Sequence, residues 1–138
     1  MPRYLLDTNI CIYLIKHQPV EVAERFARCY RGDVVMSAVT YAELQFGVAV
    51  AADPAREAEN LAALVEDIPV VPFHVGAAIA YGPIRAATRE SRKDALDKLI
   101  AAHAVSLDVT LVTNNEDDFA KYPGLRTENW AANLTSSN

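Results

Sequence analysis

The chain has 138 residues, of which 51% are hydrophobic, and carries 13 Lys and Arg against 18 Asp and Glu, which gives a formal net charge of -5. A chain of this length buries about 68% of the surface that it exposes when unfolded, so we expect one domain over residues 1–138, with an ordered body at about 2–133, a polar tail at 134–138 and no second domain. The acidic balance argues against nucleic-acid binding through bulk charge, although a locally basic surface remains compatible with acids concentrated at one site.

Short β-branched runs alternate along the chain with longer Ala-rich helical patterns. The predicted strands are residues 3–6, 34–36, 70–72, 110–112 and a weak one near 125–127, and the predicted helices are residues 9–16, 20–30, 41–52, 54–66, 75–88 and 95–107. Strands separated by helices imply right-handed crossovers and a mostly parallel sheet. The pattern therefore predicts an α/β fold of three layers, with a short-stranded sheet between helices.

The apolar segments are too short for a membrane protein. All of them, residues 46–52 included, fall far below the ~18 residues of a membrane-spanning helix, and the N-terminal Met-Pro-Arg-Tyr lacks the regions of a signal peptide. Cys11 and Cys29 lie in apolar segments without the spacing of a redox or zinc motif. We expect a cytoplasmic protein with buried free thiols and no membrane contact.

Acids follow the predicted strands at the edge where parallel α/β sheets bind ligands. Asp7 comes directly after the first strand, and Glu43 lies one helical turn past the second. Each also has an alternative role within its own helix. Asp7 or a polar residue after it can cap the helix, and Thr40 to Glu43 fits the S/T-x-x-E capping box.

The predicted helix at 95–107 brings further candidates. Asp94 and Asp97 are three residues apart on one helical face, so Asp94 can be the N-cap while Asp97 faces the cleft, but spacing alone does not assign both. His103 falls on the apolar stripe of this helix, which is typical of a hydrogen-bonded core histidine rather than a metal ligand.

The last acidic cluster follows the fourth strand and contains Asn115, Glu116, Asp117 and Asp118. Thr113 to Glu116 fits another capping box, which leaves Asp117 or Asp118 for the cleft. Carboxylates gathered within a few ångströms raise one another's pKa and oppose folding, so a bound cation best explains them. Hard oxygen ligands favour Mg2+, with Mn2+ as a substitute, and the usual partner of such a site is phosphate.

Four segments, LLDTNICIYLIK, SAVTYAELQFG, DKLIAAHA followed by TLVTNNEDDF, and PGLRTENW, resemble the PIN-domain ribonucleases, specifically the VapC-type toxins of bacterial toxin–antitoxin pairs. The resemblance implies metal ligation by Asp7, Glu43, Asp97 and Asp118, supported by Asn9, Thr113 and Asn115. Relatives often read Gly-Pro-x-Asp before the Leu-Ile-Ala-x-His stretch, whereas this chain reads Lys-Asp-Ala-Leu-Asp at residues 93–97. The spacing still selects Asp97, and the changed approach affects the rim of the site.

The resemblance further implies an Mg2+-dependent endoribonuclease, the toxin of a type II pair, that inhibits translation by cleaving structured RNA such as tRNA. It implies a homodimer and a larger assembly with a cognate VapB-like antitoxin. In the expected mechanism Asp7 and Asp97 hold the metal, Glu43 and Asp118 orient its water shell, and in-line attack on the phosphodiester leaves a 5′-phosphate and a 3′-hydroxyl.

A basic stripe offers a place for RNA. Arg85, Arg89 and Arg92 have the spacing of one helical face running toward Asp97, and we expect it to hold phosphates, with an ordinary solvated face as the alternative.

Two other functions compete with the ribonuclease. A haloacid dehalogenase-type phosphatase also has an Asp after the first strand, but it needs a second Asp two residues on, where this chain has Asn9. A catalytically silent dimeric interaction module would use the acids only as caps. Four acids at separate strand ends argue against such a module.

Overall fold

The computed structural model describes residues 2–90 and 94–131. Within these ranges the strands β1 (Tyr4–Leu6), β2 (Val34–Ser37), β3 (Val70–Val71), β4 (Thr110–Val112) and β5 (Arg126–Glu128) form one sheet in the order β3-β2-β1-β4-β5. All four strand pairs are parallel, and Leu5 of β1 lies opposite Val35 of β2 and Leu111 of β4. The predicted parallel sheet is confirmed, with β1 at its centre.

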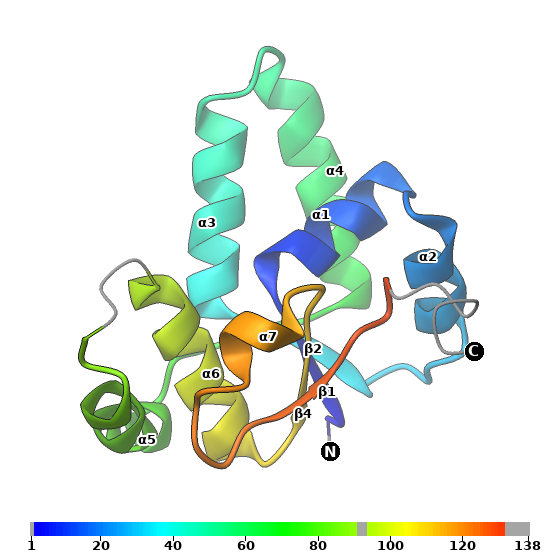
Figure 1. Cartoon of the computed structure of the whole chain (residues 1–138). Coiled ribbons are helices and arrows are strands. Elements are labelled where there is room, and N and C mark those ends of the chain that lie inside the picture. Colours follow the sequence, from blue (N-terminus) through cyan, green and yellow to red (C-terminus); the bar gives the residue numbers. More distant parts are fainter. Residues whose placement is uncertain (1, 91–93, 132–138) are drawn as a thin grey trace.

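The helices are α1 (Thr8–Lys16), α2 (Val20–Ala27), α3 (Ala38–Ala49), α4 (Pro54–Asp67), α5 (Val75–Ala87), α6 (Ala95–Leu107) and α7 (Glu116–Phe119). Figure 1 shows α3 and α4 projecting together from the sheet, while α5 and α6 lie beside one another on the opposite side from α1 and α2. None of the helices in the described ranges has both the length and the apolar character needed to cross a membrane.

Two helices differ from the prediction at their ends. The helix predicted at 41–52 begins at Ala38, because Ser37, the last residue of β2, is its N-cap and accepts the Val39 N–H at 3.0 Å. The helix predicted at 20–30 ends at Ala27. As a result β2 passes into α3 without a loop, and the first turns of α3 lie directly at the carboxyl edge of the sheet.

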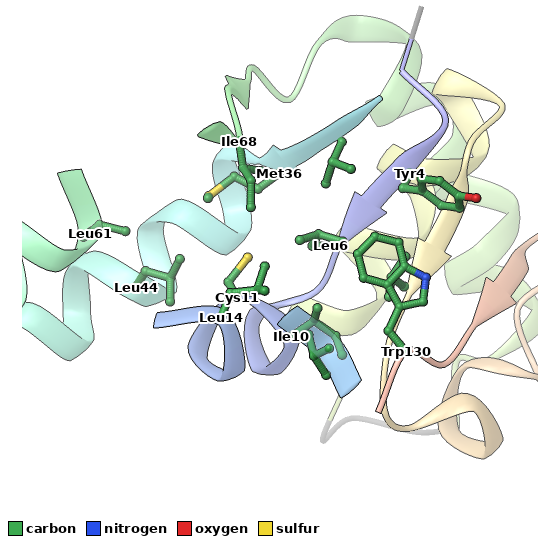
Figure 2. Close-up of a cluster of buried hydrophobic side chains, with 13 residues drawn as sticks. Tyr4, Leu6, Ile10, Cys11, Leu14, Met36, Leu44, Leu61, Ile68 and Trp130 are labelled. Atoms are coloured by element: carbon green, nitrogen blue, oxygen red, sulfur yellow. The ribbon is translucent and has the colours of Figure 1, made fainter. Parts of the chain in front are cut away.

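Alternate residues of β1 face the two sides of the sheet, as the period of a strand requires. Tyr4 and Leu6 pack in a cluster with Met36 and with buried side chains of α1, α2, α3 and α4 (Figure 2). Leu5 packs in a second cluster with Ile84 of α5 and buried residues of α6. The protein is therefore built of three layers, as predicted.

His103 lies in this second layer as a core residue. Its side chain is fully buried, and Nδ1 lies 2.7 Å from Ser37 Oγ. Burial lowers the pKa of His103 to about 4, with the neighbouring His74 acting in the same direction. The imidazole is neutral at physiological pH, and the predicted core histidine is confirmed. Both cysteines are free, but only Cys11 is buried; Cys29 is partly exposed, which corrects the expectation of two buried thiols.

Candidate active site

The four acids predicted for the site come from four different parts of the chain. Asp7 directly follows β1, Glu43 lies in α3, Asp97 lies in the first turn of α6, and Asp118 lies in α7. Because β1 pairs in parallel with β2 on one side and with β4 on the other, the segments that follow these three strands start from the same edge of the sheet.

Asp7 combines the two roles between which its sequence position left a choice. It is the N-cap of α1, where a side-chain oxygen accepts the Ile10 N–H at 3.0 Å. It is also buried among acids: burial raises the pKa of Asp7 to about 6, hydrogen bonds from Thr113 and Ile10 oppose this, and the charges of Asp97 and Glu43 add to it. The cap therefore orients a carboxylate whose ionised form is disfavoured by burial and by the neighbouring acids.

Glu43 does not form the predicted capping box. The N-cap of α3 is Ser37, and Thr40 is fully buried inside the helix, so the box has no N-cap residue at that position. The Glu43 carboxylate instead accepts a hydrogen bond of 2.6 Å from the Thr8 hydroxyl, the residue that follows Asp7. Thr8 therefore directs Glu43 toward the first acid.

Asp97 connects the remaining acids electrostatically. Its pKa is raised by burial first, then by the charges of Glu43, Asp94 and Asp118, while Lys121 acts in the opposite direction. Since Asp7 responds to Asp97 and Glu43 as well, Asp7, Glu43, Asp97 and Asp118 form one electrostatically connected group, the acidic cluster.

The segment after β4 supports two of these carboxylates. Thr113 is fully buried, hydrogen-bonds to Asp7 and accepts the Asn115 N–H at 3.0 Å. The Asn115 side chain donates to Asp118 Oδ2 at 2.5 Å. The capping box predicted for Thr113 and Glu116 is wrong, because Glu116 accepts from the Thr127 hydroxyl of β5 at 2.9 Å.

Asn9 and Asp117 stay at the margin of the site. Asn9 lies in the first turn of α1 with an exposed side chain, and Asp117 is exposed in α7. Of the two acids left open by the sequence, Asp118 is the one that acts on Asp97.

Sequence reasoning did not predict the ion pairs that Asp94 forms beside the acidic cluster. Asp94 holds the N-cap position of α6, but its side chain makes no cap hydrogen bond. It pairs instead with Lys98 and Lys121 and accepts from the Tyr122 hydroxyl. The four-residue spacing of Asp94 and Lys98 was a signal for the first of these pairs; Lys121 is distant in sequence and had none.

The predicted arginine stripe is broken. Arg85 lies in the last turn of α5, but the helix ends at Ala87 with Thr88 as its C-cap, so Arg89 lies beyond the helix and not on its face. The Thr88 hydroxyl donates back to the Ile84 carbonyl oxygen at 2.8 Å, which closes the last turn. Arg92 lies outside the described residues.

The acids suit a hard divalent cation. In the described part of the chain no three His, Cys, Asp or Glu side chains stand close enough together to form a ready metal cage. Mg2+ does not need one, because it binds through one or two carboxylates and keeps several waters. Oxygen ligands, and a buried Asp7 whose pKa is raised to about 6, fit such an ion, which would stabilise the ionised form.

The acidic cluster thus lies beyond the carboxyl edge of a short parallel sheet that helices cover on both faces, which is where ligands bind in such sheets. The sequence profile of the PIN domain family matches residues 4–125, and the chain belongs to this family. It is 39% identical over 133 residues to the tRNA(fMet)-specific endonuclease VapC of Shigella flexneri, a match that covers 95% of this chain and 100% of that protein. It is 36% identical over 132 residues to ribonuclease VapC2 of Haemophilus influenzae, with 94% and 99% covered.

Solved structures agree with the sequence match. DNA-bound VapBC from Salmonella typhimurium gives a TM-score of 0.87 at 34% identity, covering 94% of this chain and 99% of that one. VapBC2 from Rickettsia felis, bound to a promoter DNA fragment, gives 0.81 at 29% identity, covering 92% and 98%. The protein is thus a PIN-domain ribonuclease of the VapC type, a hydrolase of phosphodiester bonds, and this membership excludes the haloacid dehalogenase alternative.

Proposed function

We propose that this protein is the toxin of a type II toxin–antitoxin pair, an Mg2+-dependent endoribonuclease that inhibits translation in the cytoplasm by cleaving structured RNA, with tRNA as the substrate. The observation that carries the proposal is the acidic cluster, in which burial and neighbouring acids raise the pKa of Asp7 to about 6. The name of the Shigella flexneri relative, a tRNA(fMet)-specific endonuclease at 39% identity, supports tRNA.

Each acid has a place in the proposed reaction. Buried Asp7 and half-buried Asp97 would hold the ion, which supplies a lowered pKa for a water molecule and neutralises phosphate charge. Glu43, oriented by Thr8, and Asp118, oriented by its neighbour Asn115, would accept hydrogen bonds from the attacking water. In-line attack leaves a 5′-phosphate and a 3′-hydroxyl, without a histidine base.

RNA would bind Arg85 and Arg89 at the end of α5, together with Arg92, which lies outside the described residues. Arg85 and Arg89 are exposed. Arg89 and Lys121 line an open cavity of about 470 Å³ at this end of the helix. These side chains give local positive charge to an acidic protein, which is what phosphate binding requires.

Apolar surface beside Glu43 would be covered by a cognate VapB-like antitoxin and by a second copy of the toxin. An open groove of about 910 Å³ is lined by Ile12, Val39, Phe46 and Leu96 and reaches Glu43. Phe46 is 68% exposed, which is unfavourable for an isolated chain. The solved relatives are VapBC complexes, which supports the antitoxin, the homodimer and their larger assembly.

The test is cleavage of total tRNA with and without Mg2+, followed by sequencing of the new 5′ ends. We predict that Asp7→Asn and Asp97→Asn each abolish cleavage and growth inhibition while the protein stays folded, because each removes charge from the ion. Asp117→Asn, an exposed acid beside Asp118, is the matched control and should cleave like the wild type. Full cleavage by either folded site variant would contradict the metal assignment, and an inactive wild type with every divalent ion would favour the silent interaction module.

A further inference from the structure

A second charged cluster, Asp94, Lys98, Lys121 and Tyr122, lies beside the acidic cluster, and of its members only Lys121, which borders the proposed approach of the RNA, has a role in the function described above. Asp94 Oδ2 is 2.7 Å from Lys121 Nζ and accepts from the Tyr122 hydroxyl at 2.5 Å. Its other oxygen is 3.4 Å from Lys98 Nζ, which also donates to the Thr88 carbonyl oxygen at 2.9 Å. The Asp94 and Lys98 side chains are 11% and 6% exposed, so this is an interior network.

The Asp94 cluster joins three segments that carry or flank the site. Lys98 reaches the C-cap of α5, Asp94 stands at the start of α6, and Lys121 and Tyr122 follow α7. Asp97 and Asp118 lie on the last two of these segments. Tyr122 is 3% exposed and packs against Phe119 of α7, with ring centroids 5.7 Å apart. The cluster thereby ties the helix that carries Asp118 to the helix that carries Asp97.

We propose that Asp94 is a positioning residue of the ribonuclease site: it sets the separation of Asp97 and Asp118 by binding the segment after α7 to the start of α6. It contacts neither RNA nor metal. The proposal rests on the metal-dependent function proposed above.

The charges around Asp97 also support a positioning role for Asp94. Three carboxylates, those of Glu43, Asp94 and Asp118, act against the ionised form of Asp97, and Lys121 favours it. The Lys121 side chain is 40% exposed and would be mobile without a partner, but Asp94 holds its ammonium group at 2.7 Å. The carboxylate that adds negative charge near Asp97 is therefore also the one that holds a compensating cation in place.

The experiment compares Asp94→Asn, Asp94→Glu and Tyr122→Phe with the wild type. Mg2+ affinity is measured by titration calorimetry without RNA, and kcat and KM are measured on total tRNA. We expect Asp94→Asn to weaken Mg2+ binding and lower kcat, each on the order of ten- to a hundredfold, as removal of a residue that orients metal ligands does. KM should change by no more than a few fold, because Arg85 and Arg89 keep their surroundings and only Lys121, at the border of the RNA approach, loses its partner. Asp94→Glu should recover part of the activity, and Tyr122→Phe, which keeps its buried ring, should show a smaller decrease of the same kind.

The control is Asp108→Asn at the other end of α6, where the carboxylate pairs with Arg126 at 2.9 Å and the side chain is 88% exposed. It should leave Mg2+ affinity and kcat unchanged. If Asp94→Asn does not fold, Tyr122→Phe decides the question by the same two measurements. Wild-type Mg2+ affinity and kcat in the folded variants would overturn the inference. A wild type that binds no Mg2+ would instead overturn the proposed function, so the two failures are distinguishable.

Discussion

The Asp7 side chain caps α1 and at the same time places a buried negative charge near those of Asp97 and Glu43. Asn is as good an N-cap as Asp, so Asp7→Asn removes the charge and keeps the cap. The Asp7→Asn variant therefore measures how much the buried negative charge destabilises the folded protein, while the start of α1 stays capped.

Because burial disfavours the ionised Asp7 carboxylate, the free energy of unfolding depends on pH. The pKa of Asp7 in the folded state is raised from 3.8 to about 6, so its contribution to stability is fully present below pH 3.8 and is lost as the pH rises through about 6. Without metal at pH 8, we predict that Asp7→Asn increases the free energy of unfolding by up to about 3 kcal/mol. Below pH 3.8 the difference should vanish.

Urea denaturation of both proteins at several pH values, with a chelator present, measures this difference. Asp117→Asn serves as the control, since the exposed residue 117 should leave the profile of the wild type unchanged. A pH-independent difference, or a variant less stable than the wild type at pH 8, would show that the Asp7 carboxylate is not held against its charge.

The elements explain why sequence reasoning succeeded for the sheet and failed at several boundaries. The strands β1, β2 and β4 are short, apolar and buried, and such runs are recognisable without tertiary information. The start of α3 was placed too late because Ser37 ends a strand and caps a helix at once. The four-residue α7 was missed because it is too short to show a helical period.

The same division holds for the site. Asp7 was found from its position after a strand, a property of the local sequence, whereas position left Asp117 and Asp118 both open and only the family resemblance selected Asp118. The partners of Glu43 and Asp94 were not found, since the Thr8 hydroxyl is 35 residues from Glu43 and the Tyr122 hydroxyl is 28 residues from Asp94. Capping boxes predicted from spacing failed because tertiary partners took the glutamates.

The end of α5 leads to a prediction for RNA binding. We expect replacement of Arg85, Arg89 and Arg92 by Ala to weaken binding, with the salt slope of single-strand affinity reduced by about 0.7 for each phosphate that the variant no longer neutralises. The measurement is RNA affinity against salt in the inactive Asp7→Asn background, which separates binding from cleavage.

Two comparisons sharpen this test. Arg31→Ala, which changes an exposed residue before β2 and so near the opposite edge of the sheet, should leave the slope unchanged. Because α5 ends before Arg89, the single variant Arg85→Ala tests the helical part alone. An unchanged slope in the triple variant would mean that these arginines form a solvated face and that other basic residues hold the RNA.

At the scale of the whole molecule, we expect Mg2+ binding to stabilise the folded state. An ion that binds only the folded state stabilises it by about 2.7 kcal/mol at one hundred times its Kd, which for a domain of this size corresponds to a rise in Tm of roughly 10 °C. We predict this rise with Mg2+ for the wild type and for Asp117→Asn, and a clearly smaller one for Asp97→Asn. Scanning calorimetry checks it, and equal rises in all three proteins would show that the ion binds elsewhere.

The order of the strands has a consequence for synthesis. The central strand β1 pairs with β4, although most of the chain separates them. The acidic cluster likewise begins with Asp7 and ends with Asp118. A nascent polypeptide therefore cannot assemble the proposed catalytic centre until α7 has left the ribosomal exit tunnel, long after Asp7 has emerged. The fragment that has emerged before that point lacks Asp118, and we expect it to have no ribonuclease activity.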